Sequence, residues 1–110
     1  MKITVESVFS VQFGKFVLQA LGDLYLNGEL KAWIGFMGKV ELEAEPGENT
    51  IEISYKDAKN GSQRIKFYAT EDVNIFIRFE VTGSFSVNLT VNILALGKDL
   101  KIIEKKAIYK

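Results

Sequence analysis

The sequence predicts an all-β fold, an antiparallel β-sandwich of about seven to nine strands in a single domain spanning residues 1–110. Two observations carry this prediction. Apolar and polar residues alternate through most of the chain, as in strands that bury one face and expose the other. Turn-forming pairs separate these runs at intervals of roughly ten residues. Because parallel sheets tend to give continuous apolar runs, the alternation favours antiparallel pairing.

Each alternating run is a predicted strand whose apolar residues face the core. In chain order these apolar files run from Ile3 to Val11, Val40 to Ala44, Ile51 to Tyr55, Ile65 to Ala69, Val73 to Val81 and Phe85 to Ile93. Two more short strands flank Asn27-Gly28. Residues 16–22 fit either a buried strand or one helical turn, and the segment from Leu100 to Tyr109 fits either a last strand or a short helix.

The turn signals lie between these runs. Asn27-Gly28 is the strongest two-residue hairpin signal in the chain, because both residue types tolerate a positive φ. Pro46-Gly47 suits the centre of a type II turn and predicts a hairpin between the strands on either side of it. Asn60-Gly61 and Thr82-Gly83 predict two further reversals of the chain.

The composition excludes several kinds of chemistry. The 110 residues include no Cys and no His, which removes thiol catalysis, Ser-His-Asp triads and the usual zinc ligands. We therefore expect no metal, no cofactor and no enzyme, and rank a carboxylate-based enzyme third among the functional hypotheses. Fourteen basic residues balance fourteen acidic ones, so no general electrostatic attraction to nucleic acid is expected.

We expect no signal peptide in the N-terminal segment. Thr4, Glu6 and Ser7 interrupt the apolar run that a signal peptide requires, and no run approaches the roughly eighteen apolar residues of a membrane-spanning helix. We expect a cytoplasmic protein without membrane insertion, and an extracellular location stays open if Met1 is not the native start. The lysines near the C-terminus are interpreted as a solvated tail or a protected edge strand; they are Lys98, Lys101, Lys105, Lys106 and Lys110.

The two turn regions of the first half also resemble a known family. "DLYLNGEL" at 23–30 and "VELEAEPGENTIEI" at 40–53 are similar to PEGA-like small bacterial β-sandwich domains over about residues 22–55. The matching residues are Leu24, Leu26, Asn27, Gly28, Pro46, Gly47, Glu48, Thr50, Ile51 and Ile53. The resemblance implies an immunoglobulin-like or prealbumin-like sandwich, an accessory role in binding or scaffolding, and no catalytic residues. Asn49 departs from the pattern, since such domains often have His or Tyr there.

"AWIGFMG" at residues 32–38 is the first candidate for partner contact. Trp33, Phe36 and Met37 crowd a segment bounded by two glycines, and exposed aromatic and Met clusters are typical of contact sites. The alternation of Ala32, Ile34 and Phe36 also fits a core strand, with Trp33 covering one end of the sandwich. Both interpretations stay open from the sequence.

Two functions follow, in order of preference. The first is a non-catalytic interaction or structural module that binds a protein, or a second copy, through a sheet edge or the Trp33–Met37 segment. The alternative is a carbohydrate-binding module on the outer face of the predicted strand pair at 73–95, where amide and hydroxyl groups suit sugar hydroxyls. Its candidate residues are Phe76, Asn88, Thr90 and Asn92. The acidic residues between Glu41 and Glu48 are interpreted as a solvated face, because alternate residues of a strand lie about 7 Å apart and do not converge on one ion.

Overall fold

The computed structural model describes residues 1–11, 22–35, 38–54, 62–82 and 88–108, and their side chains except those of 8–11, 79–82 and 88–90. Nine strands lie within these ranges. They are β1 (Lys2–Val11), β2 (Gly22–Leu26), β3 (Glu29–Ile34), β4 (Lys39–Glu43), β5 (Gly47–Ser54), β6 (Ser62–Ala69), β7 (Val73–Thr82), β8 (Asn88–Gly97) and β9 (Lys101–Ile108).

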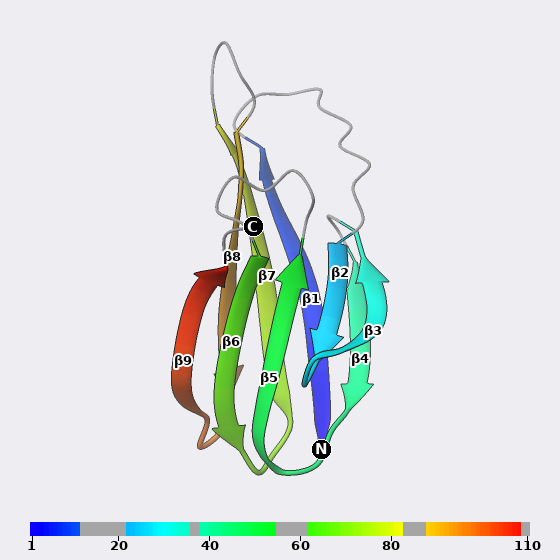
Figure 1. Cartoon of the computed structure of the whole chain (residues 1–110), viewed down its shortest axis with the longest axis vertical. Coiled ribbons are helices and arrows are strands. Elements are labelled where there is room, and N and C mark those ends of the chain that lie inside the picture. Colours follow the sequence, from blue (N-terminus) through cyan, green and yellow to red (C-terminus); the bar gives the residue numbers. More distant parts are fainter. Residues whose placement is uncertain (12–21, 36–37, 55–61, 83–87, 109–110) are drawn as a thin grey trace.

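The strands form two sheets that pack face to face (Figure 1). One sheet has four strands in the order β4-β1-β7-β8, and the other has five in the order β3-β2-β5-β6-β9. The prediction of an all-β sandwich is confirmed. One point needs correction, since β1 and β7 run parallel and make the four-stranded sheet mixed. Alternation indicates only that a strand has one solvated and one buried face. Parallel and antiparallel strands both allow this, so the pattern could not predict the parallel pairing of β1 with β7.

The core lies between the sheets and is built from the predicted apolar files. Its fully buried side chains include Ile3, Val5, Leu24, Ile51, Ile53, Ile65, Phe67, Ile75, Ile77 and Ile93. Complete burial of one such side chain contributes about 1.5–3 kcal/mol relative to leaving it in water. The inward files of both sheets therefore fix which face of every strand remains outside, and so which side chains are available for function.

Asn27-Gly28 forms the predicted hairpin between β2 and β3. Both residues have positive φ, 52° and 84°, as a type I′ turn requires. The turn is also tied to β5, because the Thr50 amide donates to Asn27 Oδ1 at 2.8 Å and the Asn27 amide donates to the Thr50 carbonyl at 2.8 Å. The hairpin prediction is confirmed, and the Asn27 side chain has a structural partner.

Pro46-Gly47 does not make the predicted hairpin. β4 pairs with β1, whereas β5 pairs with β2 and β6, so the segment between β4 and β5 crosses from one sheet to the other. Gly47 takes a φ of 122°, which favours glycine at the start of β5. The Pro-Gly signal correctly marked a change of chain direction, but the sheet that the next strand joins depends on distant partners.

The remaining predicted segments have mixed outcomes. Strands β5 and β6, and strands β7 and β8, pair antiparallel on either side of the reversals predicted at Asn60-Gly61 and Thr82-Gly83, which lie wholly or partly outside the described residues. Residues 16–21 also lie outside them. The C-terminal segment is a strand and not a helix, and β9 forms an edge of its sheet, in line with the edge-strand interpretation of its lysines.

Candidate functional site

Trp33 lies on the surface and not in the core. Its neighbour Ile34 is buried at 1% exposure, and alternation along β3 turns the Trp33 side chain to the outer face, where it is 65% exposed. β3 is an edge strand of the five-stranded sheet, so the indole stands at the border of the molecule. Phe36 and Met37, the other two predicted contact residues, lie outside the described residues.

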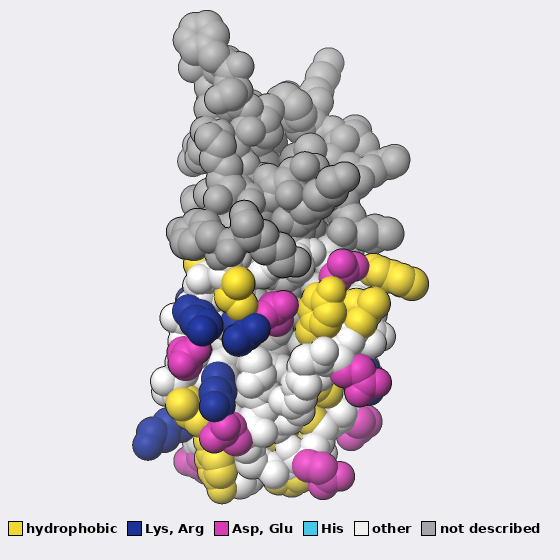
Figure 2. All heavy atoms as spheres, viewed as in Figure 1, with side chains coloured by type: hydrophobic (Ala, Val, Ile, Leu, Met, Phe, Trp, Pro, Cys, Tyr) yellow, Lys and Arg dark blue, Asp and Glu magenta, His cyan; other side chains and the backbone are white. Residues whose placement is uncertain are grey.

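Two further apolar side chains share this outer face. Leu30 lies opposite Tyr25 across the β2–β3 ladder, and a bulge between Leu24 and Tyr25 brings Leu30 and Trp33 to the same side. Leu30 is exposed and Tyr25 is half-buried. We call Tyr25, Leu30 and Trp33 the Trp33 patch. Figure 2 shows hydrophobic side chains gathered on this face, on the side of the molecule where β2 and β3 lie.

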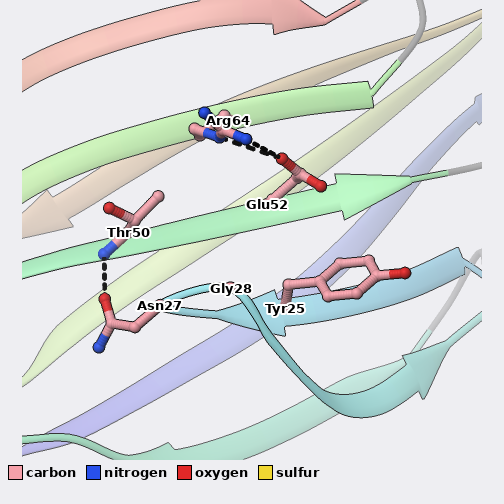
Figure 3. A pocket seen from close by; sticks show the side chains of 6 residues that line it. All are labelled: Tyr25, Asn27, Gly28, Thr50, Glu52 and Arg64. Carbon is pink, nitrogen blue, oxygen red and sulfur yellow. Dashed lines mark hydrogen bonds and ion pairs between the residues drawn. The ribbon is translucent and has the colours of Figure 1, made fainter. Parts of the chain in front are cut away.

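An open groove of about 560 Å³ borders the patch on the same face. It is lined by Tyr25, Asn27, Gly28, Thr50, Glu52 and Arg64 (Figure 3). The Arg64 guanidinium donates to Glu52 Oε1 from Nε at 3.0 Å and from Nη2 at 2.9 Å. Glu52 is the one carboxylate in this lining, and its charge is already paired. The described residues that line the groove therefore include no second carboxylate to face Glu52, as glycoside hydrolysis requires.

A second ion pair lies further along the outer face. Lys66 Nζ is 2.9 Å from Glu48 Oε1, across the β5–β6 pair. The hydrogen bond to Glu48 raises the pKa of Lys66 above its ordinary value of 10.5, and the negative charges of Glu48 and Glu104 add to this effect. In the part of the outer face where β5 and β6 pair, Glu52 and Glu48 thus each have a cationic partner.

The face predicted to bind carbohydrate is more apolar than expected. Phe76 is half-buried on the outer face of β7 and lies opposite Leu94, while the exposed Asn92 lies opposite Arg78. Leu94 is 55% and Leu96 is 50% exposed on the same face. The side chains of Asn88 and Thr90 are outside the described set.

The exposure of Leu94 and Leu96 was not predicted, although the sequence pattern indicates it. The alternation of β8 stops at Ile93, and an unbroken apolar run continues from there to Leu96. In a strand that faces solvent on one side, such a run must expose every second residue. A break in alternation is therefore a usable sign of an apolar outer face.

The acidic residues do not converge on one point. Glu41 and Glu43 are exposed on β4 in the four-stranded sheet, whereas Glu48 belongs to β5 in the other sheet. Within the described ranges, no three Asp, Glu, His or Cys side chains are grouped closely enough to hold a metal ion. Among the same residues, no helix is long and apolar enough to cross a membrane.

Comparison with known proteins gives no relative. No protein-family model matches the chain, and neither a curated protein nor a solved structure matches it.

Proposed function

We propose that this protein is a non-catalytic interaction module that contacts a protein partner through the Trp33 patch. The observation that carries the proposal is the exposure of Trp33 on edge strand β3. Trp is among the side chains most enriched at the energetic centres of protein interfaces, because it buries a large apolar area with few rotatable bonds.

The apolar area that Trp33 exposes is large enough to support an interaction role. An aromatic side chain presents about 150–250 Å² for burial. With 65% of Trp33 still in water, a partner that covers it would remove about 130 Å² of apolar surface. At about 25 cal/mol per Å², this is about 3 kcal/mol, which is the range of an interface hot spot. Leu30 and Tyr25 would add contact area around it.

The surroundings of the patch favour binding over catalysis. Among the described residues that line the bordering groove, Glu52 is the one carboxylate, and it forms an ion pair with the guanidinium of Arg64. The Asn27 side chain is engaged with Thr50 and Asn49 and serves the hairpin. A flat apolar patch with neutralised ion pairs beside it matches the apolar centre and polar rim of protein interfaces.

The test compares Trp33→Ala with Tyr68→Ala, a matched control. Tyr68 is also an exposed aromatic on the outer face, 47% exposed, but lies on β6, away from β3. Both variants should unfold in urea within about 0.5 kcal/mol of the parent protein, as expected of surface substitutions.

Affinity capture from the source organism, quantified by mass spectrometry, should then lose a partner with Trp33→Ala and keep it with Tyr68→Ala. Size-exclusion chromatography with light scattering covers the case in which the partner is a second copy. A loss of stability of about 3 kcal/mol in Trp33→Ala would instead assign the indole to packing. A response on a glycan array would favour the carbohydrate-binding alternative on the β7–β8 face.

A further inference from the structure

The four edge strands described in this sandwich differ in their protection against added strands. Exposed edges are normally blocked by charged side chains, bulges or short length. β4 has five residues, three of them charged; β3 carries Glu29 and Lys31 and a bulge; β9 carries three lysines, a glutamate and a bulge in its pairing with β6. β8 has ten residues and no charged side chain.

The second observation is that the two sheets are unequal. β8 lies against β6 across the sandwich, and β3 lies against β4 at the opposite side. β9 therefore projects past β8, with no described strand of the four-stranded sheet opposite it (Figure 1). Among the described strands, the four-stranded sheet is thus one strand short at this side.

The side chains around this gap are suited to a strand. On the inner face of β9, Ile102 lies opposite Phe67 and Lys105 lies opposite Ile65, and both side chains are exposed. On the other wall, β8 presents its edge from Ile93 to Gly97, with Leu94 and Leu96 on the outer face. We call this region, between the β8 edge and the inner face of β9, the β8–β9 slot.

We propose that the β8–β9 slot receives an extended segment of another protein, which pairs with the Ile93–Gly97 part of β8 as a fifth strand of the four-stranded sheet. Main-chain hydrogen bonds to β8 would supply affinity, and alternate side chains would supply specificity. An inward apolar residue would pack against Ile102, and an outward one against Leu94. Lys105 is the charged group of the inner wall, so an inward acidic residue complements the slot.

A second copy of this chain does not fit as the added strand. Antiparallel pairing of β8 with its copy places both five-stranded sheets on the same side of the shared sheet. The copy's β6 would then cover the position opposite the added strand, where β9 already projects. The overhang thus excludes the symmetric dimer and leaves room for a single extended strand.

This inference does not rest on the Trp33 patch, because the slot lies at the other side of the sandwich. The test uses synthetic ten-residue peptides of alternating Val and Thr. The acidic probe carries one Glu at an inward position, and the basic probe carries Lys there. Binding is followed by fluorescence anisotropy and by NMR shifts of backbone amides.

The acidic probe should bind more tightly than the basic probe by at least threefold and should shift the amides of β8 and β9. Lys105→Glu should reverse this preference, whereas Lys31→Glu, a matched change of an exposed lysine on β3, should leave it unchanged. Methylation of alternate probe amides should abolish binding in one of the two possible sets only, because a β-strand pairs through every second residue.

Three results would overturn the proposal. One is that neither probe binds at millimolar concentration. Another is that Lys31→Glu alters the preference as much as Lys105→Glu does. The third is that the β8 amides shift on concentrating the protein alone, which would show that a second copy occupies the edge.

Discussion

Asn49 offers the sharpest test of how the turns are held. Its side chain is 3% exposed, and it makes two hydrogen bonds. Asn49 Nδ2 donates to the Glu45 carbonyl at 2.9 Å, and Asn49 Oδ1 accepts from Asn27 Nδ2 at 2.9 Å. One residue of β5 thereby ties the inter-sheet connection to the β2–β3 hairpin.

Asn49→Ala removes both bonds. Each hydrogen bond contributes roughly 0.5–1.5 kcal/mol net. The Glu45 carbonyl and the Asn27 side-chain amide would be only partly rehydrated in the variant. We therefore expect a loss of about 2 kcal/mol in the free energy of unfolding. Equilibrium urea titration measures it as a lower midpoint with an unchanged slope. Asn92→Ala, the same change at an exposed position of β8, should cost less than about 0.5 kcal/mol.

Asn27→Gly separates the side chain of Asn27 from its backbone conformation, because Gly also accepts the positive φ of this position. If Asn27 and Asn49 act together, the double variant should lose less stability than the sum of the two single variants. Strict additivity, or a cost for Asn49→Ala no larger than that for Asn92→Ala, would refute the proposed network.

Two further predictions concern other polar contacts of the two sheets. Ser7 is buried, and its Oγ donates to the Gly35 carbonyl at 2.6 Å and accepts from the Gly38 amide at 2.7 Å. Ser7→Ala should therefore lower the free energy of unfolding by about 2 kcal/mol in the same titration. An unchanged midpoint would contradict this. The raised pKa of Lys66 means that its pairing with Glu48 stabilises the fold fully below pH 10.5, and that this contribution is lost as the pH rises through the higher folded-state pKa. The midpoint temperature of thermal unfolding should therefore fall less steeply with rising pH in Lys66→Met than in the parent protein. Parallel plots of midpoint temperature against pH would contradict a stabilising pair.

The parts of the fold that the sequence predicted are those set by local chemistry. Asn27-Gly28 determines its own turn, because both residues tolerate positive φ and the hairpin closes within a few residues. The sheet to which a strand belongs is set by contacts far apart in the chain. Pro46-Gly47 shows the difference, since its turn chemistry is equally compatible with a hairpin and with a crossover between sheets.

The same distinction explains the candidate sites. The sequence left residues 32–38 open between a core strand and a contact loop, because Gly35 and Gly38 allow either; the structure places Ile34 in the core and Trp33 on the surface. The exposure of Leu94 could have been predicted, because the alternation of apolar and polar residues breaks at Ile93 in the sequence. The slot beside β8 could not be predicted from the sequence, because it results from five strands packing on four, and long-range pairing decides which sheet each strand joins.

The two sides of the sandwich present different means of recognition. At the side of β3 and β4 the sheets end together, the Ser7 hydroxyl bonds the connection between them, and charged side chains and a bulge protect the β3 backbone. There the proposed partner recognises side chains, above all the indole of Trp33. At the side of β8 and β9 the described strands of the two sheets end one strand apart, and the edge strand β8 has no charged side chain. There the proposed partner supplies a strand. Because the two surfaces use different chemistry at opposite edges, substitutions in one should leave binding at the other unchanged.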